Sequence, residues 1–395
     1  MAGLAHVRRI FCRPVLVELH VLEIRSGCRL HFGLMELAEG AIGRYAGLGL
    51  MLAGPQWVLR FEPQSAPTTT IAVDTSSIED ARRATEITAR IQAVHTLQHS
   101  DSPTQAERGG ACRIVVRQAL PLHSGLGAGT QLACTAAVGL ALASPSGSEG
   151  CRLPTSPAAA QTSATWSPWQ PVQRAVPGLN PRWLVRMSGR GLRSAVGVTG
   201  FLSGGLVLDE GYGQPAVAEL SQRPLGASTT HLPARWRVVL IVPQPGTSMH
   251  GQREADALRA LGHTPHPRAA EMKGLARSIQ NLASHEDQFA AFTAALEGYM
   301  QLGAELFRPF QLGLYNGPEV TAAVEAARAV GLRGVGQSSW GPTVFGFAPD
   351  ASQAQRAADE LAASHSGWQV STARPADSGA EIRWCGRSAE EKTGC

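Results

Sequence analysis

The sequence predicts a two-domain α+β protein, and three observations carry that prediction. The chain has 395 residues, more than a single hydrophobic core usually accommodates. Strand-like and helical patterns fill its first half and return in its second half, after a Pro- and Thr-rich stretch at 224–233. Hydrophobic residues make up 44% and charged residues 17% of the chain, which is typical of a globular protein and excludes a disordered one.

The first predicted domain covers 15–230. Segments 15–24, 57–61 and 113–116 are rich in β-branched residues and predict strands. Segment 78–97 carries Ile87, Ile91 and Val94 near helical spacing, and 131–143 is an apolar segment of helical length. Between 144 and 181 Ser, Pro, Thr, Ala and Gln dominate without periodicity, which predicts a flexible surface insertion.

The second predicted domain covers 231–373 and begins with the apolar strand at 235–243. Helical patterns at 251–261, 269–283, 286–302 and 319–330 then alternate with strands at 343–347 and 368–372. The residues at 374–395 predict a polar tail.

Charge and cysteine usage narrow the function classes. A net charge of +4 is too small to indicate nucleic-acid binding, and no apolar run reaches the roughly 18 residues of a membrane span. The seven cysteines show no zinc-type spacing and predict reduced thiols, so we expect a cytoplasmic protein with no nucleic-acid or membrane partner.

The most specific motif is the glycine loop at 121–131, which joins a predicted strand to a predicted helix. Gly125, Gly127 and Gly129 let the backbone curl so that successive N–H groups converge on an anion at the helix start, and Thr130 adds a hydroxyl. The alternative is an ordinary glycine-rich turn.

Two further segments point in the same direction. Segment 188–201 contains Arg190 and Arg193, and no Asp or Glu occurs between 183 and 208, so a phosphorylated ligand would supply the missing anion. A solvated arginine face is the alternative. Segment 334–346 offers Gln337 and Ser338 as neutral hydrogen-bond donors, although a structural turn fits it equally well.

These motifs resemble a known family. GLGAGTQ at 125–131 and GQSSWGP at 336–342 resemble the phosphate loop and the late glycine-rich motif of the GHMP kinases. Segments 26–37, 43–50 and 188–211 resemble signatures of the β-ribofuranosylaminobenzene 5'-phosphate synthase branch of that superfamily. The resemblance implies a GHMP-kinase-like two-domain fold, with the phosphate loop in the N-terminal domain and a ferredoxin-like C-terminal domain.

The branch also implies a reaction. Phosphoribosyl pyrophosphate and an aromatic carboxylic acid (4-aminobenzoate or 4-hydroxybenzoate) would give an aryl riboside phosphate, carbon dioxide and pyrophosphate, a step toward methanopterin-type one-carbon carriers. Mg²⁺ is the implied cofactor. The family is compatible with a homodimer, and the sequence alone does not fix the oligomeric state or the choice of acid.

The resemblance implies a role for each candidate residue. Pyrophosphate would lie on the glycine loop, the 5'-phosphate or pyrophosphate on Arg190 and Arg193, and Mg²⁺ on Glu36. The acid's carboxylate would lie on Arg29 and His31, with Arg44 as a second candidate. The full set of expected site residues is Arg29, His31, Glu36, Arg44, Gly125, Gly127, Gly129, Thr130, Arg190, Arg193, Ser194, Gln337 and Ser338.

One departure from the kinases matters. A GHMP kinase uses a central carboxylate to activate its acceptor hydroxyl, and 183–208 has none. Phosphorylation would lack its general base and a metal ligand, whereas the riboside reaction has no hydroxyl to deprotonate. An ATP-dependent small-molecule kinase is the runner-up, and a non-catalytic phosphate-binding relative is the third possibility.

Overall fold

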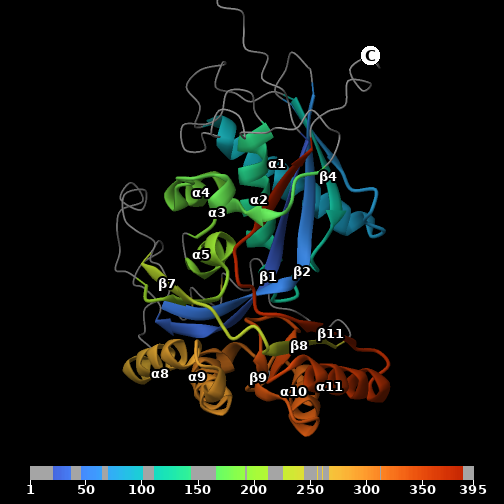
Figure 1. Cartoon of the computed structure of the whole chain (residues 1–395). Coiled ribbons are helices and arrows are strands. Elements are labelled where there is room, and N and C mark those ends of the chain that lie inside the picture. The colour runs from blue at the N-terminus through green and yellow to red at the C-terminus, as the bar shows by residue number, and fades with distance from the viewer. Residues whose placement is uncertain are drawn as a thin grey trace, which may run out of the picture.

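A computed structural model describes residues 21–36, 46–64, 70–100, 111–143, 166–191, 194–211, 226–243, 256, 260, 267–311 and 313–385. Its strands form two sheets, which lie one above the other in Figure 1. Helices accompany each sheet, so the α+β fold class is confirmed.

The first sheet has the strand order β3-β4-β2-β1-β12-β5, with β6 paired to β2 and β7 paired to β6. Its strands are β1 (Val21–Glu36), β2 (Ala46–Gln64), β3 (Ile71–Asp74), β4 (Ala111–Gln118), β5 (Gln170–Pro171), β6 (Leu206–Asp209), β7 (Ala227–Thr230) and β12 (Glu381–Cys385). Its helices are α1 (Ala81–Ser100), α2 (Ala128–Ala143), α3 (Val172–Ala175), α4 (Pro181–Ser188) and α5 (Val196–Ser203).

The second sheet is antiparallel, in the order β11-β8-β10-β9. Its strands are β8 (Arg237–Val242), β9 (Arg333–Gln337), β10 (Val344–Ala348) and β11 (Gln369–Ala373). The helical segments are α8 (Ala269–Leu282), η1 (Glu286–Gln288), α9 (Phe289–Phe307), η2 (Arg308–Phe310), α10 (Pro318–Ala329) and α11 (Ala351–Ser364). A helical crossover before β9 and another before β11 give the predicted ferredoxin-like arrangement.

Strands β1 and β2 are long enough to connect the two parts of the molecule. They pair from Leu22 opposite Phe61 to Glu36 opposite Ala46, and their far ends run below α5 toward α8 and α9 in Figure 1. The pairing register shifts between His31 and Gly33, and such a β-bulge re-aims the side chains beside it.

Helix α2 is the central helix of the first domain and is buried along almost all of its length. Trp57 on β2 fixes the start of this helix, because its indole N–H donates to the carbonyl oxygen of Ala128 at 3.0 Å. Gly139 lets the helix approach the sheet, since a Cβ there would lie 2.0 Å from Cζ of Phe61. The apolar pattern at 131–143 therefore predicted this helix correctly.

The predicted flexible insertion was wrong for residues 166–181, and its first part, 144–165, lies outside the described residues. Val172, Val176 and Leu179 are buried in the first core. The guanidinium of Arg25 lies 4.5 Å from the ring centre of Trp169. Scattered apolar anchors hold this segment, and they produce no periodicity that a sequence pattern could reveal.

The predicted polar tail was also wrong, for residues 374–385. Strand β12 pairs with β1, and the guanidinium of Arg383 pairs with the buried carboxylate of Glu23. Arg60 donates to the same carboxylate at 2.9 Å. The C-terminal strand is therefore part of the first sheet.

In the described part of the chain, no helix combines the length and the apolar character needed to cross a membrane. The predicted helix at 251–261 falls almost entirely on residues that the structure does not describe.

Candidate functional site

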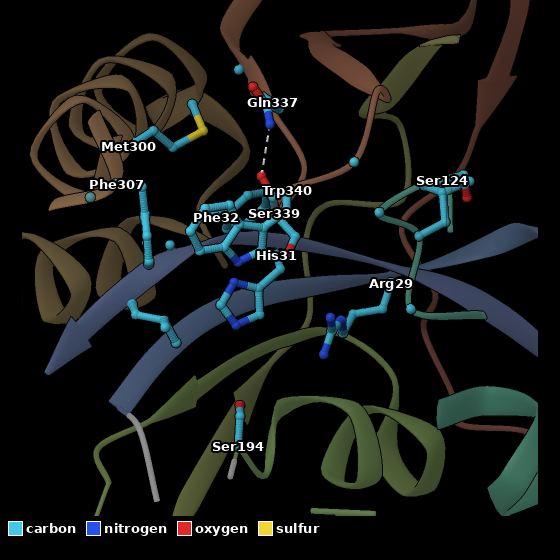
Figure 2. A pocket seen from close by; sticks show the side chains of 18 of the residues that line it. Arg29, His31, Phe32, Ser124, Ser194, Met300, Phe307, Gln337, Ser339 and Trp340 are labelled. Atoms are coloured by element: carbon cyan, nitrogen blue, oxygen red, sulfur yellow. Dashed lines mark hydrogen bonds between the residues drawn. The ribbon is translucent and has the colours of Figure 1, made fainter. Parts of the chain in front are cut away.

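The two domains enclose a cavity of about 940 Å³. Its walls come from the β1 segment that contains Arg29 and His31, the glycine loop before α2, the segment around Arg190, one face of α9, and the turn after β9. Figure 2 shows Arg29 and Ser124 on one side of this space and Met300 and Phe307 on the other, with His31 between them. All three predicted glycine-bearing segments contribute to it.

The glycine loop has the conformation that the sequence predicts. Gly125 and Gly127 have φ angles of 86° and 68°, a region that favours glycine. The loop is packed against its surroundings, since a Cβ at Gly125 would lie 2.3 Å from the carbonyl oxygen of Ser338. Helix α2 begins at Ala128, so the positive end of its dipole faces the cavity.

Three arginines surround this helix start. A Cβ at Gly129 would lie 3.1 Å from Nη1 of Arg90 and 3.5 Å from Nη2 of Arg190. A Cβ at Gly127 would lie 3.1 Å from Nε of Arg29. Three guanidinium groups therefore lie around the start of α2, within reach of Gly127 or Gly129, and this arrangement suits a doubly or triply charged phosphate group.

Arg90 is a site residue that the sequence analysis missed. It lies on α1, where Glu86 accepts from its Nη2 at 2.7 Å and from Nε2 of His123 at 2.8 Å. Both Arg90 and His123 line the cavity. On a helical pattern, an arginine four residues after a glutamate indicates an ordinary surface ion pair, so no local signal separates Arg90 from a solvated residue.

The first carboxylate after the acid-free segment, Asp209, is used structurally. Asp209 is fully buried, accepting from the backbone N–H of Ala195 at 2.7 Å and of Gly211 at 3.0 Å. It thereby fixes the start of α5, directly after Ser194. Asp209 is thus a positioning residue for this segment.

His31 is buried in the cavity wall, and burial together with the charge of Arg29 lowers its pKa to about 3. A histidine with this pKa is neutral at neutral pH. His31 therefore offers a hydrogen bond and no positive charge, whereas the charge that could hold a carboxylate belongs to Arg29.

The pKa of His31 predicts a pH-dependent stability. Unfolded His31 titrates near pH 6.5, so between pH 6.5 and about 3 the unfolded state binds a proton that the folded state does not. Stability should therefore fall as the pH falls through this window, by about 2 kcal/mol at pH 5. Urea unfolding at pH 7 and pH 5 measures it. His31→Gln should lose less stability than the parent protein over this step, and equal losses would contradict the assignment.

Of the remaining predicted site residues, some line the cavity, one does not, and some lie outside the described residues. Thr130, Ser194 and Gln337 line the cavity. Ser338 has a different place from the one predicted: it is fully buried, accepts from the backbone N–H of His31 at 3.1 Å and donates to the carbonyl oxygen of Gly125 at 2.9 Å. Its hydroxyl ties β1 to the glycine loop and does not face the cavity. Three predictions fall outside what the structure describes: Arg44, Arg193 and the side chain of Glu36.

The described residues around the glycine loop do not fit a protein-held Mg²⁺. Magnesium prefers several oxygen ligands, among them carboxylates. The cavity wall near the loop is cationic, and Glu86 already accepts from Arg90 and His123. Within the described ranges no three His, Cys, Asp or Glu side chains form a metal-binding group.

The opposite wall of the cavity is apolar and aromatic. Phe307 and Trp340 form an edge-to-face pair with ring centres 4.4 Å apart, and Met300 and Phe32 lie beside them. The sequence did not predict this wall, because its members lie on different elements. Trp340 belongs to the motif at 336–342, but nothing in that motif indicates that its ring meets Phe307. The cavity thus joins an anion-binding end to an end that suits a flat apolar group.

Comparison with known proteins agrees with this fold. The family described as "GHMP kinases C terminal" matches residues 272–366. Homoserine kinase from Cytophaga hutchinsonii has a similar structure, with a TM-score of 0.55 and 14% identity over 92% of this chain and 97% of that one. Mevalonate pyrophosphate decarboxylase from Streptococcus pyogenes gives a TM-score of 0.54 and 10% identity over 91% and 98%. Residues 272–366 therefore match the C-terminal family of the GHMP kinases, and the chain shares its fold with these two proteins.

Two sequence relatives narrow the resemblance. The chain is 25% identical over 342 residues to a beta-ribofuranosylphenol 5'-phosphate synthase from Methanothermobacter thermautotrophicus, covering 82% of this chain and 88% of the relative. It is 24% identical over 334 residues to the protein of the same name from Methanocaldococcus jannaschii, with the same coverage. The resemblance to this synthase branch is therefore confirmed, and the relatives' names indicate an enzyme with a synthase role.

Proposed function

We propose that this enzyme condenses phosphoribosyl pyrophosphate with 4-aminobenzoate or 4-hydroxybenzoate, releasing carbon dioxide and pyrophosphate. The observation that carries the proposal is the convergence of Arg29, Arg90 and Arg190 on the start of α2. The relatives' printed name, beta-ribofuranosylphenol 5'-phosphate synthase, supports the same product class.

The charge distribution suits the chemistry. The reaction needs a departing pyrophosphate to be stabilised and a cationic ribosyl centre to meet the ring of the acid. The backbone N–H groups at the start of α2, with Arg90 and Arg190 beside them, bind the phosphates and stabilise the leaving group. Arg29 holds the acid's carboxylate against this end of the cavity, and neutral His31 donates or accepts a hydrogen bond without adding charge.

The second substrate fits the other end of the cavity. A benzoate ring would lie against Phe307, Trp340 and Met300 while its carboxylate points toward Arg29. Enclosing both substrates in one cavity brings the ring carbon and the ribosyl carbon together, and such positioning alone lowers the barrier substantially. Mg²⁺ would enter the cavity bound to the pyrophosphate of the donor and would neutralise part of its charge.

The alternative is an ATP-dependent kinase, which the structural similarity to homoserine kinase favours. Thermal protection separates the two. With Mg²⁺ in the buffer, phosphoribosyl pyrophosphate at about 100 times its Kd should stabilise the protein by roughly 2.7 kcal/mol, which raises its Tm by several degrees. Stronger protection by ATP would reverse the assignment. Release of carbon dioxide and pyrophosphate from the ribosyl donor and 4-hydroxybenzoate then tests the reaction itself.

A further inference from the structure

One face of helix α9 lines the cavity. Its cavity residues follow the helical repeat, because positions three and four apart lie on the same side of a helix. They are Glu297, Met300, Gln301, Gly303, Ala304 and Phe307. The apolar wall described above is therefore one helix face, and Glu297 lies one turn beyond Met300 along it.

Glu297 differs in charge from its surroundings. Among the described residues that line the cavity it is the only Asp or Glu, whereas four are arginines: Arg29, Arg90, Arg190 and Arg328. Its Oε1 accepts from the backbone N–H of Val335 at 3.1 Å, which fixes the carboxylate against β9. A fixed carboxylate beside an aromatic wall is an acceptor for a hydrogen-bond donor on the far side of a bound ring.

We propose that Glu297 accepts a hydrogen bond from the 4-amino or 4-hydroxyl group of the aromatic acid. This assignment rests on the proposed function. In that substrate the carboxylate and the donor group lie at opposite ends of the ring, and the cavity likewise offers Arg29 and Glu297 in different walls, with Met300 and Phe307 on the same helix as the glutamate.

The contact also has a chemical effect. The ring carbon that carries the carboxylate bonds to C1 of the ribose, and the C1–oxygen bond breaks as pyrophosphate leaves with its electron pair. The bond to the carboxylate then breaks, carbon dioxide leaves, and its electron pair restores the aromatic ring. An amino or hydroxyl group hydrogen-bonded to a carboxylate releases more electron density into the ring, which favours the first of these steps.

Glu297→Gln tests the assignment because the amide keeps the size of the side chain and its oxygen can still accept from Val335. The measured quantity is the ratio of kcat/KM for 4-hydroxybenzoate to that for 4-methoxybenzoate, which has no donor hydrogen. We expect a ratio of about ten or more in the parent protein. In Glu297→Gln the ratio should fall toward one, because the amide can donate a hydrogen bond to the methoxy oxygen. The steric difference between the two acids is the same in both proteins, so it does not account for the change in the ratio.

The control is Glu305→Gln on the same helix. Glu305 has 52% of its side chain exposed and does not line the cavity, so this variant should keep the ratio of the parent protein. The KM for phosphoribosyl pyrophosphate should be the same in all three proteins.

The outcomes are separable. If the parent protein turned over both acids with equal kcat/KM, the role of Glu297 would be overturned and the proposed function would stand. An unchanged ratio in Glu297→Gln would have the same two consequences. The first of these readouts needs no variant, so it holds even if Glu297→Gln does not fold. Failure of the parent protein to release pyrophosphate with any of these acids would instead overturn the proposed function.

Discussion

Arg190→Lys is expected to weaken the binding of phosphoribosyl pyrophosphate by roughly 1.5–3 kcal/mol, the usual contribution of a hydrogen bond to a charged group. Nη2 of Arg190 lies near the first turn of α2, where a planar guanidinium can donate two parallel hydrogen bonds to a phosphate. Lysine keeps the charge and loses that geometry. Titration calorimetry with the ribosyl donor measures the effect.

Arg186→Lys is the matched control for this prediction. Arg186 lies one turn earlier, in the last turn of α4, and its exposed side chain does not line the cavity. This variant should bind the donor as the parent protein does. If both variants bound equally well, Arg190 would belong to a solvated surface and not to the anion site.

Gly139→Val is expected to cause a large loss of stability. The added Cβ would lie between 2.0 and 2.4 Å from three ring atoms of Phe61, which is itself fully buried. Neither α2 nor β2 can move away from the other without opening a gap in the core. Overpacking of this kind lowers the stability by roughly 1–3 kcal/mol or more. A fall in Tm and in the urea midpoint would show it.

Gly274→Ala is the matched control for Gly139→Val, and it is expected to raise the stability of the protein and not to lower it. Gly274 lies inside α8 and is exposed, and apart from its chain neighbours and the backbone of its own helix no heavy atom lies within 4 Å of the position that a Cβ would take. Removing a helical glycine there should stabilise the protein by about 0.5–1 kcal/mol. If Gly139→Val proved as stable as the parent protein, the close packing of α2 on β2 would be wrong.

Local patterns explain which elements could be predicted. Helix α2 and strand β8 have strong apolar runs, and the glycine loop lies directly between a strand and a helix, so all three were found. Helix α11 was missed because its buried face consists of Ala354, Ala357, Ala358 and Leu361, and alanine gives a weak hydrophobic signal. Strand β12 was missed because it has five residues and its partner lies at the other end of the sequence.

The same reasoning applies to the site. The glycine loop and Arg190 could be predicted because each belongs to a continuous motif. Arg90 and Phe307 could not, since each lies on a helix outside any motif. Trp340 belongs to the motif at 336–342, but its contact with Phe307 arises only in the folded chain. The motif singled out Ser338, but only the folded structure shows that its hydroxyl donates to the glycine loop.

The position of β12 has a consequence for how the protein is made. Glu23 and Arg383 are 360 residues apart in the chain, yet they form an ion pair in the first sheet. During synthesis the ribosome releases β1 long before β12, and until then Glu23 lacks one of its two arginine partners and β1 lacks one neighbouring strand. The N-terminal half therefore cannot complete its structure as it emerges. The second sheet uses only strands β8 to β11, which leave the ribosome before β12, so the first domain is expected to complete its fold after the second one.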